Sequence, residues 1–220
     1  MNSNSKALVL LSGGQDSSTV LFWAKKKFAQ VESIGFNYGQ KHKLELEVAS
    51  GIATIAKVNY YIAEISTLPD VSKNALTSSA IDVEKGVKSD APPNTLVEGR
   101  NLLFLTYAAI YAKKKHVNNL VMGVGQTDYS GYPDCRNEFI QSAQQTISLA
   151  TDFEFSIHTP LMWKNKAETW QLADELGVLN IIRENTLTCY NGIIADGCGK
   201  CPACILRKRG LDEYLDSTIS

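Results

Sequence analysis

The sequence predicts an α/β fold, a parallel doubly wound sheet, followed by a small C-terminal segment with a cysteine cluster. Extended and helical patterns alternate along most of the 220 residues, a glycine turn follows the first apolar run, and four closely spaced cysteines stand near the end. Repeated strand–helix units form parallel sheets with helices on both faces. We therefore expect residues 1–185 to form the α/β domain and residues 186–220 to form a zinc-binding segment packed on it.

The elements follow in order from the patterns. Residues 7–11 are wholly apolar, as in a strand buried on both faces, and a helix over residues 17–27 follows them. Further strands are predicted over residues 33–38, 59–65, 119–124 and 155–158. Further helices are predicted over residues 43–57, 101–115, 137–150 and 166–176, with Gly177 where a helix-ending glycine belongs. Pro202 suits the first turn of a last helix that runs toward Leu215. Residues 67–99 are long for a connection and indicate a functional or mobile loop.

Size and charge limit the possible partners. The 24.2 kDa chain has a formal net charge of −1, which gives no general attraction to nucleic acid. The lysines of residues 25–27 and 113–115 end predicted helices, where they complement the helix dipole and face water. No apolar stretch reaches the ~18–20 residues that span a bilayer, and the first six residues are polar. We expect a cytoplasmic protein with no membrane partner, whose cysteines are thiols or metal ligands.

The turn after the first strand has the composition of a phosphate-binding loop. Gly13 and Gly14 allow positive φ and let backbone N–H groups approach an anion, and the next helix directs its free N–H groups there. Ser12 and Ser17 add hydroxyl donors, and Asp16 either caps the helix or holds a metal near the phosphates. An ordinary turn with a serine or aspartate cap is the alternative. The residues expected to bind a nucleotide here are Leu10, Leu11, Ser12, Gly13, Gly14, Gln15, Asp16, Ser17, Ser18, Thr19 and Val20, and the resemblance described below implies that this nucleotide is ATP.

Four cysteines form a candidate metal site: Cys189, Cys198, Cys201 and Cys204. Four thiolates that close on one cation make a tetrahedral structural zinc site. An iron–sulfur cluster is the main alternative, and a redox pair would leave two cysteines unexplained. Cys135 stands apart, and we expect a small buried side chain there rather than a nucleophile, because no histidine partner is evident.

Several motifs together resemble one family. The spacing of SGGQDSS at residues 12–18 is not that of a Walker loop, and it resembles the PP-loop of N-type ATP pyrophosphatases, which have the adenine nucleotide alpha hydrolase-like fold. With NYGQKH at 37–42, VEGRN at 97–101, TDYSGYPDCR at 127–136 and the cysteine tail, the chain is similar to the 7-cyano-7-deazaguanine synthase family. Two positions depart from the family pattern. Lys41 replaces an arginine, which keeps the charge but loses a planar fork, and Glu98 replaces a proline.

The resemblance implies an ATP-dependent carbon–nitrogen ligase of queuosine precursor synthesis. Such an enzyme converts 7-carboxy-7-deazaguanine and ammonia to 7-cyano-7-deazaguanine through two adenylations, with Mg²⁺ assisting ATP. The resemblance also implies a homodimer, while no direct nucleic-acid partner is expected. Alternative hypotheses are a PP-loop enzyme that thiolates tRNA or forms lysidine, an amidotransferase-type synthetase, and a zinc module that binds nucleic acid. The chain is small and slightly acidic and shows no added RNA-binding segment or glutaminase domain, which favours the deazaguanine ligase over these alternatives.

The resemblance also implies residue roles. Asp16, Ser17 and Lys166 are expected to be catalytic, with Lys166 near the leaving group, and Arg100 is expected to bind ATP. The deazaguanine is expected to contact Tyr38, Gln40, Asp128, Tyr129, Tyr132, Asp134 and Arg136. An aspartate can accept from guanine-like N–H groups, an arginine can pair with the 7-carboxylate, and tyrosines can stack. The alternatives are a surface arginine, a solvated first-turn lysine and a plain Gly-Tyr-Pro-Asp turn. We expect His42 to be structural.

Overall fold

The protein is described by a computed structural model that covers residues 5–40, 44–65, 97–127 and 132–219. Its centre is a five-stranded sheet in the order β3-β2-β1-β4-β5, and every neighbouring pair is parallel. The strands are β1 Lys6–Leu10, β2 Gln30–Asn37, β3 Asn59–Glu64, β4 Asn119–Val121 and β5 Ser156–His158. The predicted fold class is confirmed. Because β2 and β4 lie on opposite sides of β1, the strand order reverses there, which is where open sheets of this kind bind ligands.

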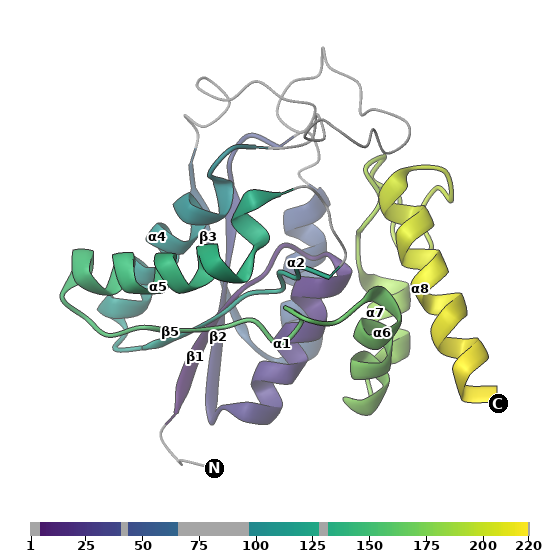
Figure 1. The fold of residues 1–220 in the computed structure, drawn as a ribbon, viewed down its shortest axis with the longest axis horizontal. Helices are drawn as coiled ribbons and strands as arrows, with labels where there is room; N and C mark the ends of the chain where they lie inside the picture. The colour runs from purple at the N-terminus through teal and green to yellow at the C-terminus, as the bar shows by residue number, and fades with distance from the viewer. Residues whose placement is uncertain (1–4, 41–43, 66–96, 128–131, 220) are drawn as a thin grey trace.

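Helices cover both faces of the sheet (Figure 1). Those that pack directly on it are α1 Gln15–Lys27, α2 Leu44–Ala56, α4 Arg100–Lys114 and α5 Asn137–Thr151. One core cluster joins α4 and α5 to one face, with Ile34, Leu105 and Leu120 fully buried in it. A second cluster joins α1 and α2 to the other face around Val9, Leu21 and Ile52. Both clusters include alternate residues of β1, as expected of a strand that is buried on both sides.

Three further helices form a group beside α1: α6 Lys166–Glu175, α7 Leu179–Asn185 and α8 Pro202–Ile219 (Figure 1). Trp170, Ile182, Leu211 and Tyr214 make their small core. The indole N–H of Trp170 donates to the carbonyl oxygen of Arg207 at 3.2 Å and so ties α6 to α8. The C-terminal segment therefore packs on the α/β part through α6, and a domain boundary at residue 185 remains a prediction.

Several local predictions need correction. Gly14, not Asp16, is the N-cap of α1, so Asp16 lies in the first turn, where a carboxylate complements the helix dipole. Gly13 has φ +80°, whereas Gly14 has φ −76° and is not left-handed. The strand predicted over residues 119–124 ends at Val121, because residues 122–125 line the pocket described below. The short helix α7 was not predicted, and α8 runs beyond Leu215.

A three-residue 3₁₀ helix, Pro133–Cys135, precedes α5. The predicted loop at residues 67–99 lies mostly outside the described residues. No helix in the described part of the chain is both long and apolar enough to cross a membrane.

Candidate functional site

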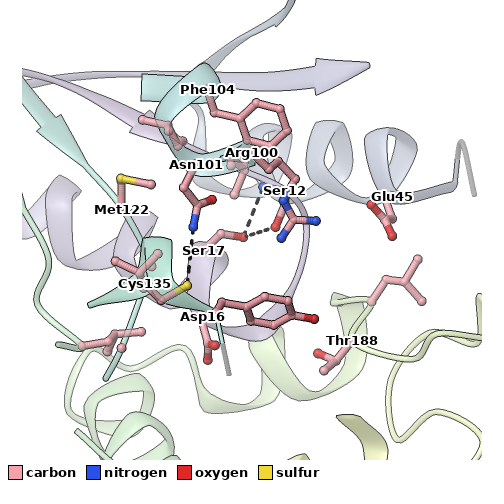
Figure 2. A pocket seen from close by; sticks show the side chains of 18 of the residues that line it. Ser12, Asp16, Ser17, Glu45, Arg100, Asn101, Phe104, Met122, Cys135 and Thr188 are labelled. Carbon is pink, nitrogen blue, oxygen red and sulfur yellow. Dashed lines mark hydrogen bonds between the residues drawn. The ribbon is translucent and has the colours of Figure 1, made fainter. Parts of the chain in front are cut away.

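A pocket of about 400 Å³ opens where β1, β2 and β4 end (Figure 2). Leu10, Leu11 and Ser12 follow β1 into it, Phe36 and Tyr38 come from the end of β2, and Met122 follows β4. Further lining residues come from α1, α2, α4, α6 and α8, from the segment 187–190, and from the loops that contain Tyr132 and Leu161. Because carboxyl ends of parallel strands meet at one edge, residues that are far apart in the sequence converge here.

The loop after β1 is held in one shape by its own serines. The Ser12 N–H donates to Ser17 Oγ at 3.2 Å, the two hydroxyl oxygens lie 3.1 Å apart, and Ser17 Oγ donates to the Gly14 carbonyl oxygen at 3.2 Å. Gly13 adopts φ +80°, and a Cβ there would lie only 2.8 Å from the backbone nitrogen of Ala49 in α2. The loop is thus fixed between β1 and α2, with the N-terminus of α1 at the pocket, as an anion site requires.

The structure brings two of the predicted catalytic residues into direct contact. Lys166 Nζ donates to both carboxylate oxygens of Asp16, at 2.9 and 2.7 Å. The side chain of Asp16 is 35% exposed and that of Lys166 only 16% exposed, so the lysine is not a solvated first-turn residue. Lys166 begins α6, whose N-cap Asn165 forms a capping box with Glu168. This rigid start of the helix holds the ammonium over the first turn of α1.

The opposite wall contains Arg100, Tyr38 and Glu45. Arg100 Nη1 lies 3.5 Å from Tyr38 Oη, and the guanidinium carbon lies 5.9 Å from the centre of that ring. Burial by itself would lower the pKa of Arg100, but Tyr38, Tyr132 and Asp134 outweigh it and raise that pKa. Arg100 is therefore a permanent positive charge facing the loop serines (Figure 2). An anion in the pocket would lie between this charge and the start of α1.

The predicted substrate residues have different positions. Tyr38, Gln40 and Tyr132 line the pocket, but the Gln40 amide binds backbone, accepting from Tyr38 N at 2.9 Å and donating to the Phe36 oxygen at 3.1 Å. The buried Asp134 carboxylate accepts the Asn101 N–H at 2.9 Å, so it holds the start of α4. Arg136 is exposed at the N-cap of α5, outside the lining of this pocket. Asp128 and Tyr129 lie outside the described residues, as do Lys41 and His42.

The predicted ATP residues divide into two groups. Leu10, Leu11, Ser12, Asp16 and Ser17 line the pocket, while Gln15, Ser18, Thr19 and Val20 are buried in α1. Gly13 and Gly14 belong to neither group, because they shape the loop without lining the pocket. Cys135 also lines the pocket and accepts from Asn101 Nδ2 at 3.4 Å. Burial and the nearby Asp134 raise its pKa to about 11, so its thiol stays protonated near neutral pH, in agreement with the expectation that it is not a nucleophile.

Sequence reasoning missed Glu45 and Thr188, both of which line the pocket. Glu45 is in the first turn of α2, where an acidic residue is ordinary, and no motif distinguishes it. Thr188 directly precedes the first cysteine of the cluster, and this adjacency was the available signal. Burial raises the pKa of Glu45 to about 7, although Arg100 lowers it in part.

We expect Glu45→Gln to change the pH dependence of stability. The ordinary pKa of this carboxyl is 4.5, and the value in the folded protein is about 7. The folded state therefore holds this proton more tightly, and the resulting stability is lost as the pH rises toward 7 and above. A neutral glutamine avoids this loss, so the melting temperature of the variant relative to wild type should rise between pH 5 and pH 8. Thermal melts over this range test it, and a difference that does not change with pH would contradict it.

The four C-terminal cysteines form one cluster. Their sulfur atoms all lie within 4.8 Å of one another, with Cys201–Cys204 at 3.3 Å and Cys198–Cys204 at 3.9 Å. Four sulfurs about 2.3 Å from a tetrahedral zinc would lie roughly 3.8 Å apart. Gly197 has φ +71°, and a Cβ there would lie 2.4 Å from the sulfur of Cys204. The predicted cluster is thus confirmed as a group of atoms that could hold a metal ion.

The surroundings of Cys198 suit a thiolate. The N–H groups of Lys200 and Cys201 donate to the sulfur of Cys198 at 3.4 and 3.3 Å, and the amide of Asn191 donates to it at 3.3 Å. These donors lower the pKa of Cys198 to about 6. A thiolate whose sulfur accepts hydrogen bonds from nearby N–H groups is a suitable ligand for a soft or borderline cation such as zinc.

Comparison with known proteins agrees with these features. A family model described as "Queuosine biosynthesis protein QueC" matches residues 6–215. A 7-cyano-7-deazaguanine synthase of Bacteroides fragilis is 57% identical over 212 residues, which are 96% of this chain and 97% of that protein. One of Clostridium acetobutylicum is 54% identical over 209 residues, or 95% of this chain and 94% of that protein.

Two solved structures share the fold at low sequence identity. A 4-thiouridine synthetase, solved with RNA and ATP, matches with a TM-score of 0.55 and 18% identity over 98% of this chain, but only 52% of that longer chain. An NH3-dependent NAD synthetase from Campylobacter jejuni matches with a TM-score of 0.50 and 17% identity, over 83% of this chain and 68% of that one.

Proposed function

The chain belongs to the family of the queuosine biosynthesis protein QueC, and we propose that it makes 7-cyano-7-deazaguanine from 7-carboxy-7-deazaguanine, ammonia and ATP. The observation that carries the proposal for this chain is the convergence of Asp16, Lys166 and Arg100 around the serine–glycine loop. A cation pair around a helix N-terminus is what transfer of an adenylyl group from a triphosphate needs.

The chemistry explains why ATP is needed twice. A carboxylate is a poor electrophile, because oxide would have to leave. Attack of a carboxylate oxygen on the α-phosphorus of ATP releases pyrophosphate and forms an acyl adenylate, from which ammonia displaces AMP to give the amide. The amide oxygen then attacks the α-phosphorus of a second ATP and releases a second pyrophosphate, and loss of AMP and of the two amide N–H protons gives the nitrile. Each ATP removes one oxygen atom from the substrate.

We assign the phosphate end of ATP to the loop after β1. Ser12, Ser17 and the first N–H groups of α1 would bind pyrophosphate oxygens, with Gly13 and Gly14 permitting close approach. Lys166, held by Asp16, would neutralise the charge that grows on the leaving pyrophosphate, and Arg100 would face it from the other wall. Mg²⁺ is usually held by one or two carboxylates plus phosphates, and the part-exposed Asp16 fits that role; bound there, it would supply further charge neutralisation.

The deazaguanine would bind against the aromatic side of the pocket. Phe36 and Phe104 stack with ring centres 4.2 Å apart, and the ring of Tyr38 packs at a tilt against Phe104 with ring centres 5.3 Å apart. A flat heterocycle would find stacking surface on this wall and on Tyr132. We retain Asp128 and Tyr129 as proposed ligands of its polar edge. Arg136 lies outside the pocket lining, so its proposed pairing with the 7-carboxylate requires the substrate to extend beyond that lining. Asp134 would act by positioning α4 and Arg100, because its carboxylate holds the N-terminus of that helix.

Protons must leave the nitrogen atom in both halves of the reaction. Glu45 lines the pocket, and its pKa of about 7 lets it accept a proton near neutral pH. We assign it this role, since the other carboxylate of the described lining, Asp16, is paired with Lys166.

We also propose that the cysteine cluster holds structural zinc, that the protein is cytoplasmic, and that it forms a homodimer. All four cysteine sulfurs lie close enough to bind one zinc ion together. A zinc ion with four protein ligands has no coordination position left for water or substrate, which is typical of a structural site. Tyr107 and Ile110 are exposed on one face of α4 and offer apolar surface that a second subunit could cover.

The decisive experiment is an assay of the purified protein with carboxy-deazaguanine, ATP, Mg²⁺ and ammonium. Mass spectrometry should detect the nitrile together with two AMP and two pyrophosphate per product. Formation of ADP would contradict attack at the α-phosphorus, and absence of the nitrile would contradict the substrate. Omission of ammonium, which should leave the acid unconverted, is the control.

A further inference from the structure

The segment between α7 and the first cysteine forms one wall of the pocket. Leu187, Thr188, Cys189 and Tyr190 all line it. The Leu187 N–H donates to the Gly13 carbonyl oxygen at 2.9 Å, and the Gln15 N–H donates to Thr188 Oγ1 at 3.4 Å. This wall is thus bonded directly to the loop that we assign to the phosphates of ATP.

Arg207 of α8 holds the segment from behind. Its guanidinium is buried, with the residue only 3% exposed, and its carbon lies 5.1 Å from the centre of the Trp170 ring. Nη1 donates to Thr186 Oγ1 at 2.7 Å and to Thr188 Oγ1 at 2.8 Å, while Nη2 donates to the carbonyl oxygens of Ile182 and Arg183. The planar fork of an arginine suits such a set of fixed acceptors.

The two threonines bound by this arginine differ in one respect. A hydroxyl has one hydrogen to donate and two lone pairs to accept with. Thr186 accepts from Arg207 and donates to the Ile182 oxygen at 2.6 Å, so its hydrogen is used inside the protein, where the residue is fully buried. Thr188 accepts twice, from Arg207 and from the Gln15 N–H. Both of its lone pairs are engaged, and its hydrogen has no acceptor among the described residues.

Thr188 is half-buried at the edge of the pocket, on the side of Asp16 (Figure 2). We infer that the Thr188 hydroxyl is a further phosphate ligand, which donates its hydrogen to a phosphate oxygen of ATP. Arg207 is then the positioning residue, because its hydrogen bond to Thr188 Oγ1 directs the hydroxyl hydrogen toward the pocket. The inference rests on the proposed function, because it assumes that ATP phosphates occupy the pocket. A hydroxyl that accepts from a cation is also a stronger donor, because hydrogen bonds in series polarise one another.

The test compares Thr188→Val with Thr188→Ser and with the matched control Thr186→Val. Binding of ATP with Mg²⁺ and of adenosine is measured by calorimetry, with melting temperature and metal content recorded for each variant. Hydrogen bonds to charged groups are the stronger kind, and we expect Thr188→Val to weaken ATP binding about tenfold or more. Adenosine binding should change less than about twofold, and serine should restore ATP binding to within about threefold. Thr186→Val should lower the melting temperature and leave ATP affinity within about twofold.

Two results would overturn the inference: ATP affinity equal to wild type in Thr188→Val, or an equal loss for ATP and adenosine, which would indicate packing alone. A wild-type protein that binds no ATP would instead overturn the proposed function. For Arg207, a double-mutant cycle is decisive. Arg207→Met should weaken ATP binding in the wild-type background and much less in the Thr188→Val background, whereas equal losses in both backgrounds would remove Arg207 from this role.

Discussion

Replacing Asp16 with asparagine is expected to lower the rate of nitrile formation by about a hundredfold to a thousandfold, the usual loss when one preorganised charge partner leaves a transition state. The carboxylate accepts both hydrogen bonds from Lys166 Nζ, and an asparagine offers only one oxygen and no charge. Lys166 would lose its fixed position, and the proposed Mg²⁺ ligand would be weakened. The measurement is initial rates of nitrile and AMP formation at saturating ATP.

The fold should survive this change. Asp16 is part-exposed in the first turn of α1, where loss of a carboxylate costs about 0.3–1 kcal/mol through the helix dipole. Lys166→Gln is the matched control, because it removes the other partner of the same pair. If the two residues act as one unit, the double variant should be no slower than the slower single variant. Additive losses in the double variant would show that they act separately, and wild-type turnover in Asp16→Asn would remove it from the mechanism.

The parts of the site that could be predicted are those that short segments encode. The serine–glycine loop and the four cysteines each lie within a short stretch of sequence. The local backbone conformation of such a stretch brings its own residues together, so these two groupings could be predicted without knowledge of the tertiary structure. The order of strands and helices followed from apolar periodicity for the same reason. The family resemblance implied roles for Asp16 and Lys166 near the phosphates, but the contact between them, which spans 150 positions, was not predicted.

The residues that could not be predicted owe their roles to packing between distant elements. Arg207 stands in the sequence Arg207-Lys208-Arg209 and has the composition of a charged surface, but packing of α8 on α6 buries it. Glu45 has the sequence position of an ordinary first-turn acid, but the fold buries its carboxyl near Arg100. The resemblance predicts that Asp134 binds the substrate, and it gave no sign that this carboxylate also holds the start of α4. No local pattern distinguishes these cases, because tertiary neighbours determine what each side chain contacts.

Removal of the zinc ion that we propose for the cysteine cluster is expected to have the largest effect on stability. Structural zinc contributes about 10–16 kcal/mol in small peptides at neutral pH, which matches or exceeds the 5–15 kcal/mol that stabilises a typical domain. Cys204 is 1% exposed, and its sulfur faces those of Cys198 and Cys201, so Cys204→Ser removes one ligand without changing the size of the side chain much. We expect this variant to lose its bound metal and to melt at a markedly lower temperature.

The loss should reach the nucleotide site as well, because Cys189 directly follows Thr188 and α8 carries Arg207. Elemental analysis of the wild type should find one zinc per chain, while iron with visible absorbance would instead support the iron–sulfur alternative. Cys135→Ser is the control, since that cysteine lies outside the cluster and should keep the full metal content. Equal metal content and melting temperature in Cys204→Ser and wild type would contradict a stabilising metal at this cluster, and the segment 186–204 would then depend on Arg207 and the α6–α8 core alone.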